Sequence, residues 1–214
     1  MSQDLFERMA QAVIEGEPDE AQALARTAVA EGVDPLAAIN RGYTAGMNHL
    51  GQAFGKGECY LPDLLAGAEA MKRALKILEP ELVNRGEKRE TRGRVVIGTV
   101  AGDIHEIGKS LVGILLTANG FEVHDLGVNV KPETFVSKVR ELNANVLCLS
   151  ALLTTTMVGQ RQVIESLKQA GVRDRVKVLV GGAPVTPKWA TDIGADGYAE
   201  NAQGAVDAVT RLLS

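Results

Sequence analysis

The segment Val95–Ser110, VVIGTVAGDIHEIGKS, holds the side chains best suited to chemistry. An apolar, β-branched run leads into a short loop that carries Asp103 and His105, and a helical pattern follows. Loops at the carboxyl ends of strands are where open α/β sheets bind ligands. Asp103 could accept the Nδ1 proton of His105, which would leave Nε2 free to bind a metal. For this loop alone, a histidine that only bonds a nearby carboxylate is an equally good interpretation.

The remaining histidines and a phosphate-like motif give weaker signals. His49 lies in a predicted helix and His124 in a predicted strand, and no metal-ligand spacing joins them, which favours structural roles. Gly108-Lys109-Ser110 resembles the end of a P-loop, but a P-loop would need glycine at position 103. Asp103 stands there instead, and its carboxylate would repel a phosphate. Nucleotide hydrolysis is therefore disfavoured.

Two more loops follow predicted strands, and we expect them at the same edge of the sheet as His105. The segment Ser150–Thr156, SALLTTT, ends one strand, and Gly181-Gly182 ends the next. Paired glycines allow a bulky group to approach the backbone closely. Each segment taken alone is also typical of an ordinary turn.

The hydrophobic period divides the chain into two parts. Before residue 94 the apolar spacing is helical, and after it strand-like runs alternate with helical ones. We expect a four-helix bundle over 1–84, a charged linker over 85–93, and an α/β domain over 94–214. The domain is predicted to be a doubly wound, Rossmann/flavodoxin-like parallel sheet of order 2-1-3-4-5. Its predicted strands are Arg94–Val100, Phe121–Leu126, Val146–Leu152, Val176–Val180 and Gly197–Ala199.

Composition excludes several classes of protein. The net charge is −4 and the only basic run is short, which argues against a nucleic-acid partner. No apolar stretch approaches the roughly 18 residues of a membrane span, and the polar N-terminus does not resemble a signal peptide. The two cysteines, Cys59 and Cys148, do not form a disulfide framework. We therefore expect a cytoplasmic protein with no membrane partner.

The three loops together form a known pattern. Asp-x-His-x-x-Gly is followed after 41 residues by Ser-x-Leu and after 28 more by Gly-Gly, which is the cobalamin-binding signature. With it, the chain resembles the corrinoid proteins of methanol, methylamine and methoxyaromatic methyltransferase systems, and the cobalamin-binding region of methionine synthase. The likeness covers nearly the whole chain, because the segment 54–64, FGKGECYLPDL, is similar to the family's cap segment.

The resemblance implies a specific cofactor site. Cobalamin or a related cobamide would bind with its own base displaced, and His105 would be the lower axial ligand of cobalt. Asp103 would hydrogen-bond His105, and Thr156 would extend that network. The other implied cofactor contacts are Ile104, Ile107, Gly108, Ser150, Leu152, Thr154, Gly181, Gly182 and Tyr198, with Tyr60, Leu64 and Met71 as cap candidates above the ring.

The implied function is methyl carriage through methylcobalamin and cob(I)alamin states. One partner would be a substrate-specific methyltransferase, and another a second methyltransferase that uses a tetrahydrofolate-type or thiol acceptor. A reductive activation protein is a further candidate partner. Such a carrier has no catalytic residues of its own, which leaves its status as an enzyme open. The methyl donor is not encoded in these motifs.

Three alternatives remain open from the sequence. The small subunit of an adenosylcobalamin-dependent mutase shares the histidine loop but usually lacks the helical bundle. A cobalamin-dependent sensor shares the two-part layout but adds a DNA-binding domain. A receiver-like sheet without a cofactor would need an acidic cluster at its strand ends, where only Asp103 is expected.

Overall fold

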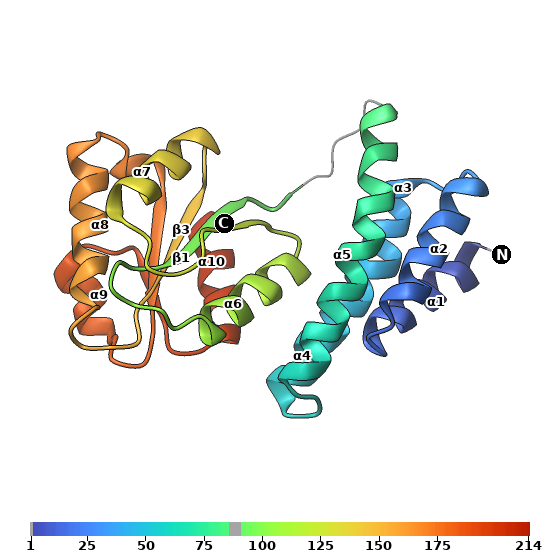
Figure 1. The fold of residues 1–214 in the computed structure, drawn as a ribbon, viewed down its shortest axis with the longest axis horizontal. Helices are drawn as coiled ribbons and strands as arrows, with labels where there is room; N and C mark the ends of the chain where they lie inside the picture. Colours follow the sequence, from blue (N-terminus) through green and yellow to red (C-terminus); the bar gives the residue numbers. More distant parts are fainter. Residues whose placement is uncertain (1, 86–90) are drawn as a thin grey trace. The chain divides into compact units, whose positions relative to one another are not determined.

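The computed structural model describes residues 2–85 and 91–214, and Figure 1 traces both parts. Their internal contacts divide the chain into a helical unit, Met1–Glu90, and a sheet unit, Thr91–Ser214. Five positions of the predicted linker, 86–90, lie outside the described residues. Each unit is described by itself below.

The helical unit is the predicted bundle. Asp34 caps the start of its third helix, because its carboxylate accepts hydrogen bonds from the backbone N–H groups of Leu36 and Ala37 and Pro35 follows. That helix contains a π-helical turn, η1, and ends at Gly57, whose φ of +75° is typical of a glycine C-cap. The elements are α1 (Ser2–Ile14), α2 (Pro18–Ala30), α3 (Pro35–Ala37), η1 (Ala38–Tyr43), α4 (Thr44–Lys56) and α5 (Leu61–Asn84).

The sheet unit contains five parallel strands in the order β2-β1-β3-β4-β5, which confirms the predicted topology. The strands are β1 (Arg94–Thr99), β2 (Glu122–Asp125), β3 (Val146–Ser150), β4 (Lys177–Gly181) and β5 (Gly197–Ala199). The connecting helices are α6 (Ile107–Ala118), α7 (Pro132–Glu141), α8 (Val158–Gln169), the short 3₁₀ turn η2 (Arg173–Arg175), α9 (Pro187–Ile193) and α10 (Ala202–Leu213).

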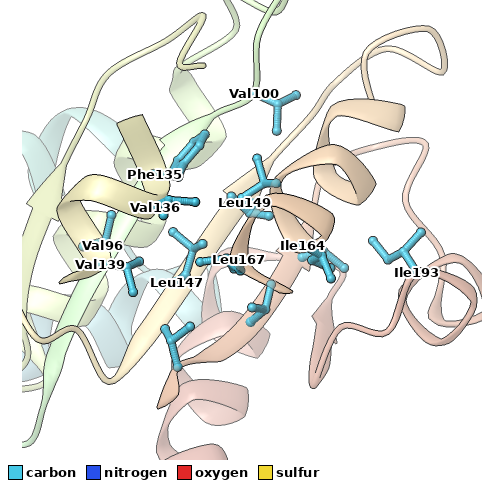
Figure 2. Packing of buried hydrophobic residues seen from close by; sticks show 14 of the residues in the cluster. Val96, Val100, Phe135, Val136, Val139, Leu147, Leu149, Ile164, Leu167 and Ile193 are labelled. Carbon is cyan, nitrogen blue, oxygen red and sulfur yellow. The ribbon is translucent and has the colours of Figure 1, made fainter. Parts of the chain in front are cut away.

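Helices cover both faces of the sheet. Figure 1 shows α7, α8 and α9 on one face and α6 and α10 on the other. Figure 2 shows the core on the first face, where Leu147 and Leu149 of β3 contact the apolar sides of α7 and α8. Cys148 lies between these two leucines on β3. It is also buried, and burial raises the pKa of its thiol to about 12. It is a small core residue.

Strand β3 is two residues shorter than the sequence predicted. The prediction extended it to Leu152, but the ladder ends at Ser150. The N–H of Leu152 leaves the sheet and donates to a carboxylate oxygen of Asp103, 2.8 Å away. The strand therefore ends where its backbone begins to bind the histidine loop.

Candidate functional site

Three strands end in one row at the carboxyl edge of the sheet. The register pairs Thr99 of β1 with Ser150 of β3, and Ser150 with Gly181 of β4. The loop with His105 follows the first of these strands, and the other two predicted loops follow the next two. The three segments of the sequence motif therefore lie side by side, as the parallel topology required.

Asp103 is the centre of the hydrogen-bonding network in this row. Its Oδ1 lies 2.7 Å from Nδ1 of His105 and accepts the backbone N–H of the same residue at 3.1 Å. Its Oδ2 accepts from the Thr156 hydroxyl at 2.6 Å and from the Leu152 N–H at 2.8 Å. The contacts predicted from Asp103 to His105 and from Thr156 to Asp103 are both present.

These bonds decide the charge of Asp103. Burial, which leaves 1% of the residue exposed, would raise its pKa. Hydrogen bonds from Thr156, Leu152 and His105 outweigh burial and hold the pKa of this carboxyl well below its usual range. An ionised Asp103 is an acceptor only, so the proton of neutral His105 lies on Nδ1. Nε2, on a side chain that is about half exposed, is then available as a ligand.

Further contacts hold the backbone of the histidine loop, and the sequence did not predict them. The buried Thr99 hydroxyl donates to the carbonyl of His105 at 2.9 Å. Asn129, which follows β2, accepts the Gly102 N–H on its Oδ1 at 2.8 Å and donates its own N–H to the Asp103 carbonyl at 2.9 Å. The only sequence signal for Asn129 is an asparagine in a glycine-containing turn.

Lys109 makes a second contact in this region that the sequence did not predict. It is buried in the first turn of α6, and its ammonium group pairs with the Asp125 carboxylate at the end of β2. Asp125 also accepts the N–H of Gly127 at 2.8 Å. The lysine of the P-loop-like Gly-Lys-Ser therefore has a partner within the protein, which agrees with the sequence argument against a phosphate site.

Exposed apolar side chains occur on the histidine loop and on the loop after β3, which is bonded to Asp103. Ile104 and Ile107 are 75% and 72% exposed, and Leu152 and Leu153 are also exposed. We call these four residues the apolar rim. Exposed apolar surface of this kind marks a place where an apolar partner binds. A flat, largely apolar ring of a metal cofactor is a suitable partner for exposed apolar residues on the two loops that meet at Asp103, beside an imidazole nitrogen that is available as a ligand.

The glycines of the motif have different physical roles. A Cβ added to Gly182, whose φ is +126°, would lie 1.8 Å from the Ala151 carbonyl oxygen, and one on Gly181 would lie 3.0 Å from that of Ala199. The neighbouring backbone therefore already requires small residues there. A Cβ on Gly108 would meet no atom of residues 2–85 or 91–214 within 4 Å. Gly108 thus leaves open space at the start of α6, where a ligand would need it.

A buried amide supports the ends of β3 and β4. Nε2 of Gln160, which is fully buried in α8, donates to the carbonyls of Leu149 and Gly181 at 3.0 and 3.1 Å. Its Oε1 accepts the indole N–H of Trp189 at 3.0 Å. The carboxyl ends of β3 and β4 are therefore held together by hydrogen bonds from one side chain of α8.

The other predicted contacts lie in different surroundings. Thr154 is exposed in the loop after β3, and Tyr198 of β5 is half-buried against the sheet core. In the helical unit, Tyr60 is 73% exposed, whereas Leu64 and Met71 are 0% and 2% exposed.

The burial of Leu64 and Met71 corrects the view of the cap. Both share a face of α5 with Gly67, where an added Cβ would lie 2.3 Å from Leu50 of α4 and 2.8 Å from the Val13 carbonyl. This face packs into the bundle, so the two side chains offer a ligand almost no surface. Leu65, one position along the helix, is exposed instead.

A single histidine is the metal ligand that this edge offers. Within residues 2–85 and 91–214, no three His, Cys, Asp or Glu side chains converge as a metal site requires. A cobalt ion that is already held by the nitrogens of a corrin ring needs only an axial ligand from the protein, so the donor set fits a corrinoid. None of the helices described combines the length and apolar character of a membrane span.

Comparison with known proteins identifies the family. A family model described as "B12 binding domain" matches residues 93–207, and a second B12 binding domain model matches residues 5–79. The trimethylamine corrinoid protein of Methanosarcina barkeri is 47% identical over 99% of this chain and 98% of its own. The chain belongs to the corrinoid protein family. A corrinoid is therefore the cofactor of this corrinoid protein, and the edge around His105 is the part of its structure that fits one.

Other relatives agree over the full length. Corrinoid protein DSY3155 of Desulfitobacterium hafniense is 45% identical over 100% of this chain and 99% of its own. Among solved structures, the methanol:cobalamin methyltransferase complex MtaBC of Methanosarcina barkeri gives a TM-score of 0.88 at 31% identity, covering 97% of this corrinoid protein and 80% of that chain. A cobalamin-binding protein from Desulfitobacterium hafniense gives 0.70 at 31% identity, with 97% and 98% covered.

Proposed function

We propose that this corrinoid protein carries a methyl group on cobalt between two methyltransferases, with cobalamin or a related cobamide bound base-off and His105 as the lower axial ligand. The observation that carries the proposal is the geometry of His105. Its Nδ1 is hydrogen-bonded to a buried, ionised carboxylate, its ring is about half exposed, and the exposed apolar rim lies on its own loop and on the loop bonded to Asp103. When bound, the corrinoid supplies a cobalt ion that accepts and releases the methyl group.

The residues of the chain would control how His105 holds cobalt. Asp103 keeps the imidazole proton on Nδ1, which makes Nε2 a stronger electron-pair donor to a metal. Thr156 donates to the other oxygen of the same carboxylate, so it adjusts how strongly Asp103 attracts the imidazole proton. The apolar rim would exclude water from the side of the bound corrinoid that faces His105. Gly108, Ser150, Leu152, Thr154, Gly181, Gly182 and Tyr198 are the proposed contacts of the displaced nucleotide tail and the ring edge.

The helical unit is proposed to protect the upper face of the corrinoid. Its candidates for that role are Tyr60 and Leu65, because both expose large apolar side chains. We retain 1–84 and 94–214 as the bounds of cap and cofactor domains, joined over 85–93. A cytoplasmic location is also proposed, supported by the free thiols of Cys59 and Cys148.

The proposed partners follow from the relatives. The first is a substrate-specific methyltransferase, because a structural relative is named as part of the complex MtaBC. Methylated amines are the donors to test first, since relatives at 47% and 44% identity are named trimethylamine and dimethylamine corrinoid proteins. A second methyltransferase with a tetrahydrofolate-type or thiol acceptor, and a reductive activation protein, complete the proposed system.

Nitrogen-isotope labelling of histidine tests the axial ligand. The protein is labelled with ¹⁵N-histidine, loaded with unlabelled cobalamin, and reduced to cobalt(II) for electron paramagnetic resonance. A doublet splitting of the cobalt lines would come from a protein histidine, and a triplet from the cofactor's own base. We expect the doublet in the wild type and in the control His124→Ala, and its loss in His105→Ala. A doublet that persists in His105→Ala would refute the assignment.

A methyl-transfer assay distinguishes a methyl carrier from a mutase subunit. The loaded protein is reduced to cobalt(I) and mixed with a methylamine methyltransferase and its substrate, and methylation is followed in the visible spectrum. A carrier becomes methylated and is then demethylated by an acceptor methyltransferase. A protein that binds only adenosylcobalamin productively would instead be a mutase subunit.

A further inference from the structure

We infer that Asn129 is a positioning residue for His105, through the histidine loop that its segment supports. The inference rests on the proposed role of His105 as the cobalt ligand. It concerns the turn after β2, a part of the chain outside the three loops of the sequence motif. This turn runs beside the histidine loop and bonds it at several points.

The segment 126–130 follows β1 and its loop step by step. The N–H of Leu126 donates to the Ile97 carbonyl at 2.8 Å, and the Gly127 carbonyl accepts the Thr99 N–H at 3.0 Å. The Val130 N–H then donates to the Thr99 carbonyl at 3.0 Å. The turn is therefore an extension of the sheet along the outer side of the histidine loop.

Asn129 makes the two contacts that reach the loop itself. Its Oδ1 accepts the Gly102 N–H at 2.8 Å, and its own N–H donates to the Asp103 carbonyl at 2.9 Å. Because the group on Gly102 is a donor, only the oxygen of the Asn129 amide can face it. The two bonds fix the backbone on both sides of the peptide between Gly102 and Asp103, two residues before His105.

The backbone of Asn129 supports a specific role. Its φ is +54°, in the left-handed region that non-glycine residues rarely adopt and that asparagine tolerates better than most. Gly102, its partner, also has a positive φ of +81°. A glycine at a loop entrance is a natural hinge, and the Asn129 side chain restrains it.

The consequence is that Asp103 is held at both its backbone and its side chain. Asn129 bonds the carbonyl, while Leu152 and Thr156 bond the carboxylate. If the Asn129 contact to Gly102 is lost, the carboxylate stays bound but the loop entrance can rotate. His105 would then sample positions at which Nε2 no longer points to the same place.

Two variants separate the side-chain contact from the backbone conformation. Asn129→Gly accepts the left-handed φ without strain and removes Oδ1. Asn129→Asp keeps an oxygen acceptor at the same position. In the apoprotein we expect amide hydrogen exchange at Gly102 to be about fivefold faster in Asn129→Gly, the effect of losing one hydrogen bond of ~1 kcal/mol. Exchange at Val178, in β4, serves as the internal control and should not change.

The loaded protein provides the second measurement. With ¹⁵N-histidine label, Asn129→Gly should bind as much cobalamin as the wild type but show a smaller doublet fraction in the cobalt(II) spectrum, about threefold lower, while Asn129→Asp stays near the wild type. Unchanged Gly102 exchange and an unchanged doublet in Asn129→Gly would overturn the inference. A wild type without any doublet would instead refute the proposed function, while Gly102 exchange would still decide whether Asn129 holds the loop.

Discussion

Asp103 joins three segments of the sheet unit through one residue. Its Oδ1 binds His105, its Oδ2 binds the loop after β3, and its carbonyl binds Asn129 after β2. A carboxylate with this many fixed donors cannot reorient to accommodate the loss of one of them. The site is therefore most sensitive to substitutions among the donors of Asp103.

The hydroxyl of Thr156 is the donor that can be removed with the least change of shape. Thr156→Val keeps the β-branch but leaves Oδ2 of Asp103 without this bond. Because a hydrogen bond to a buried charged group contributes about 2 kcal/mol, we expect the apoprotein to lose about that much stability in urea unfolding. The pKa of Asp103 should also rise toward its usual value.

Two control variants accompany the urea unfolding of Thr156→Val. Thr156→Ser retains the hydroxyl and should stay close to the wild type. Thr155→Val changes an exposed neighbour and should have no effect on stability. Equal stability of Thr156→Val and Thr155→Val would show that the Thr156 bond contributes nothing.

At the scale of the element, a substitution in the first turn of α6 can separate the stability of the protein from its affinity for the corrinoid. Gly108 lies there with open space beside it, and no contact among the described residues requires a glycine at this position. In Gly108→Ala we expect the apoprotein to be as stable as the wild type or up to about 1 kcal/mol more stable, since alanine favours a helix. Corrinoid affinity, measured by titration of the visible spectrum, should fall at least about tenfold because the methyl group fills the open space.

Gly182→Ala provides the contrast. Its Cβ would clash with the Ala151 carbonyl and its φ is unfavourable, so the apoprotein itself should be destabilised. If Gly108→Ala binds the corrinoid as tightly as the wild type, the space at Gly108 does not belong to the cofactor.

Local patterns carried most of the element predictions. Alternating strand-like and helical runs predicted the five strands, because these signals depend on neighbouring residues, and the strand order followed from the fold class that such alternation indicates. Helical spacing alone could not tell two adjacent faces of α5 apart. Leu64 and Met71, the predicted cap contacts, are buried, whereas Leu65 beside them is exposed.

The site was predictable for the residues that the sequence motif and the family resemblance name, including the contact of Thr156 with Asp103 across 53 positions, and not for residues outside them. Asp103 and His105 are two positions apart, and their bond was expected. Asn129 and Gly102 are 27 positions apart and meet only because β1 and β2 pair in one register. The contact of Lys109 with Asp125 arises in the same way, from a helix start beside a strand end.

At the scale of the whole molecule, the core of the sheet unit is built from its own residues. Its core cluster is drawn from residues 96–193, all within this unit. Its first residues are also fixed: the Arg92 N–H donates to the Gly120 carbonyl at 3.1 Å, and its guanidinium lies 5.1 Å from the centre of the Phe121 ring.

A fragment of residues 91–214 should therefore fold alone. We expect a single cooperative thermal transition by circular dichroism and, after loading with cobalamin, the same ¹⁵N-histidine doublet as the full chain. A fragment that starts at residue 95 and lacks Arg92 is the comparison, and it should unfold at a lower temperature. If the fragment 91–214 has no cooperative transition, the sheet unit depends on the helical one.

The hydrogen bond between Trp189 and Gln160 gives the protein a built-in optical reporter. Trp189 is the only tryptophan in the sequence, and the amide that binds its indole also binds the Gly181 carbonyl. The emission of a single fluorophore is thus connected through one side chain to the strand edge where the cofactor's tail is proposed to lie. Intrinsic fluorescence can follow the filling of that edge in unlabelled protein, independently of any colour change at cobalt.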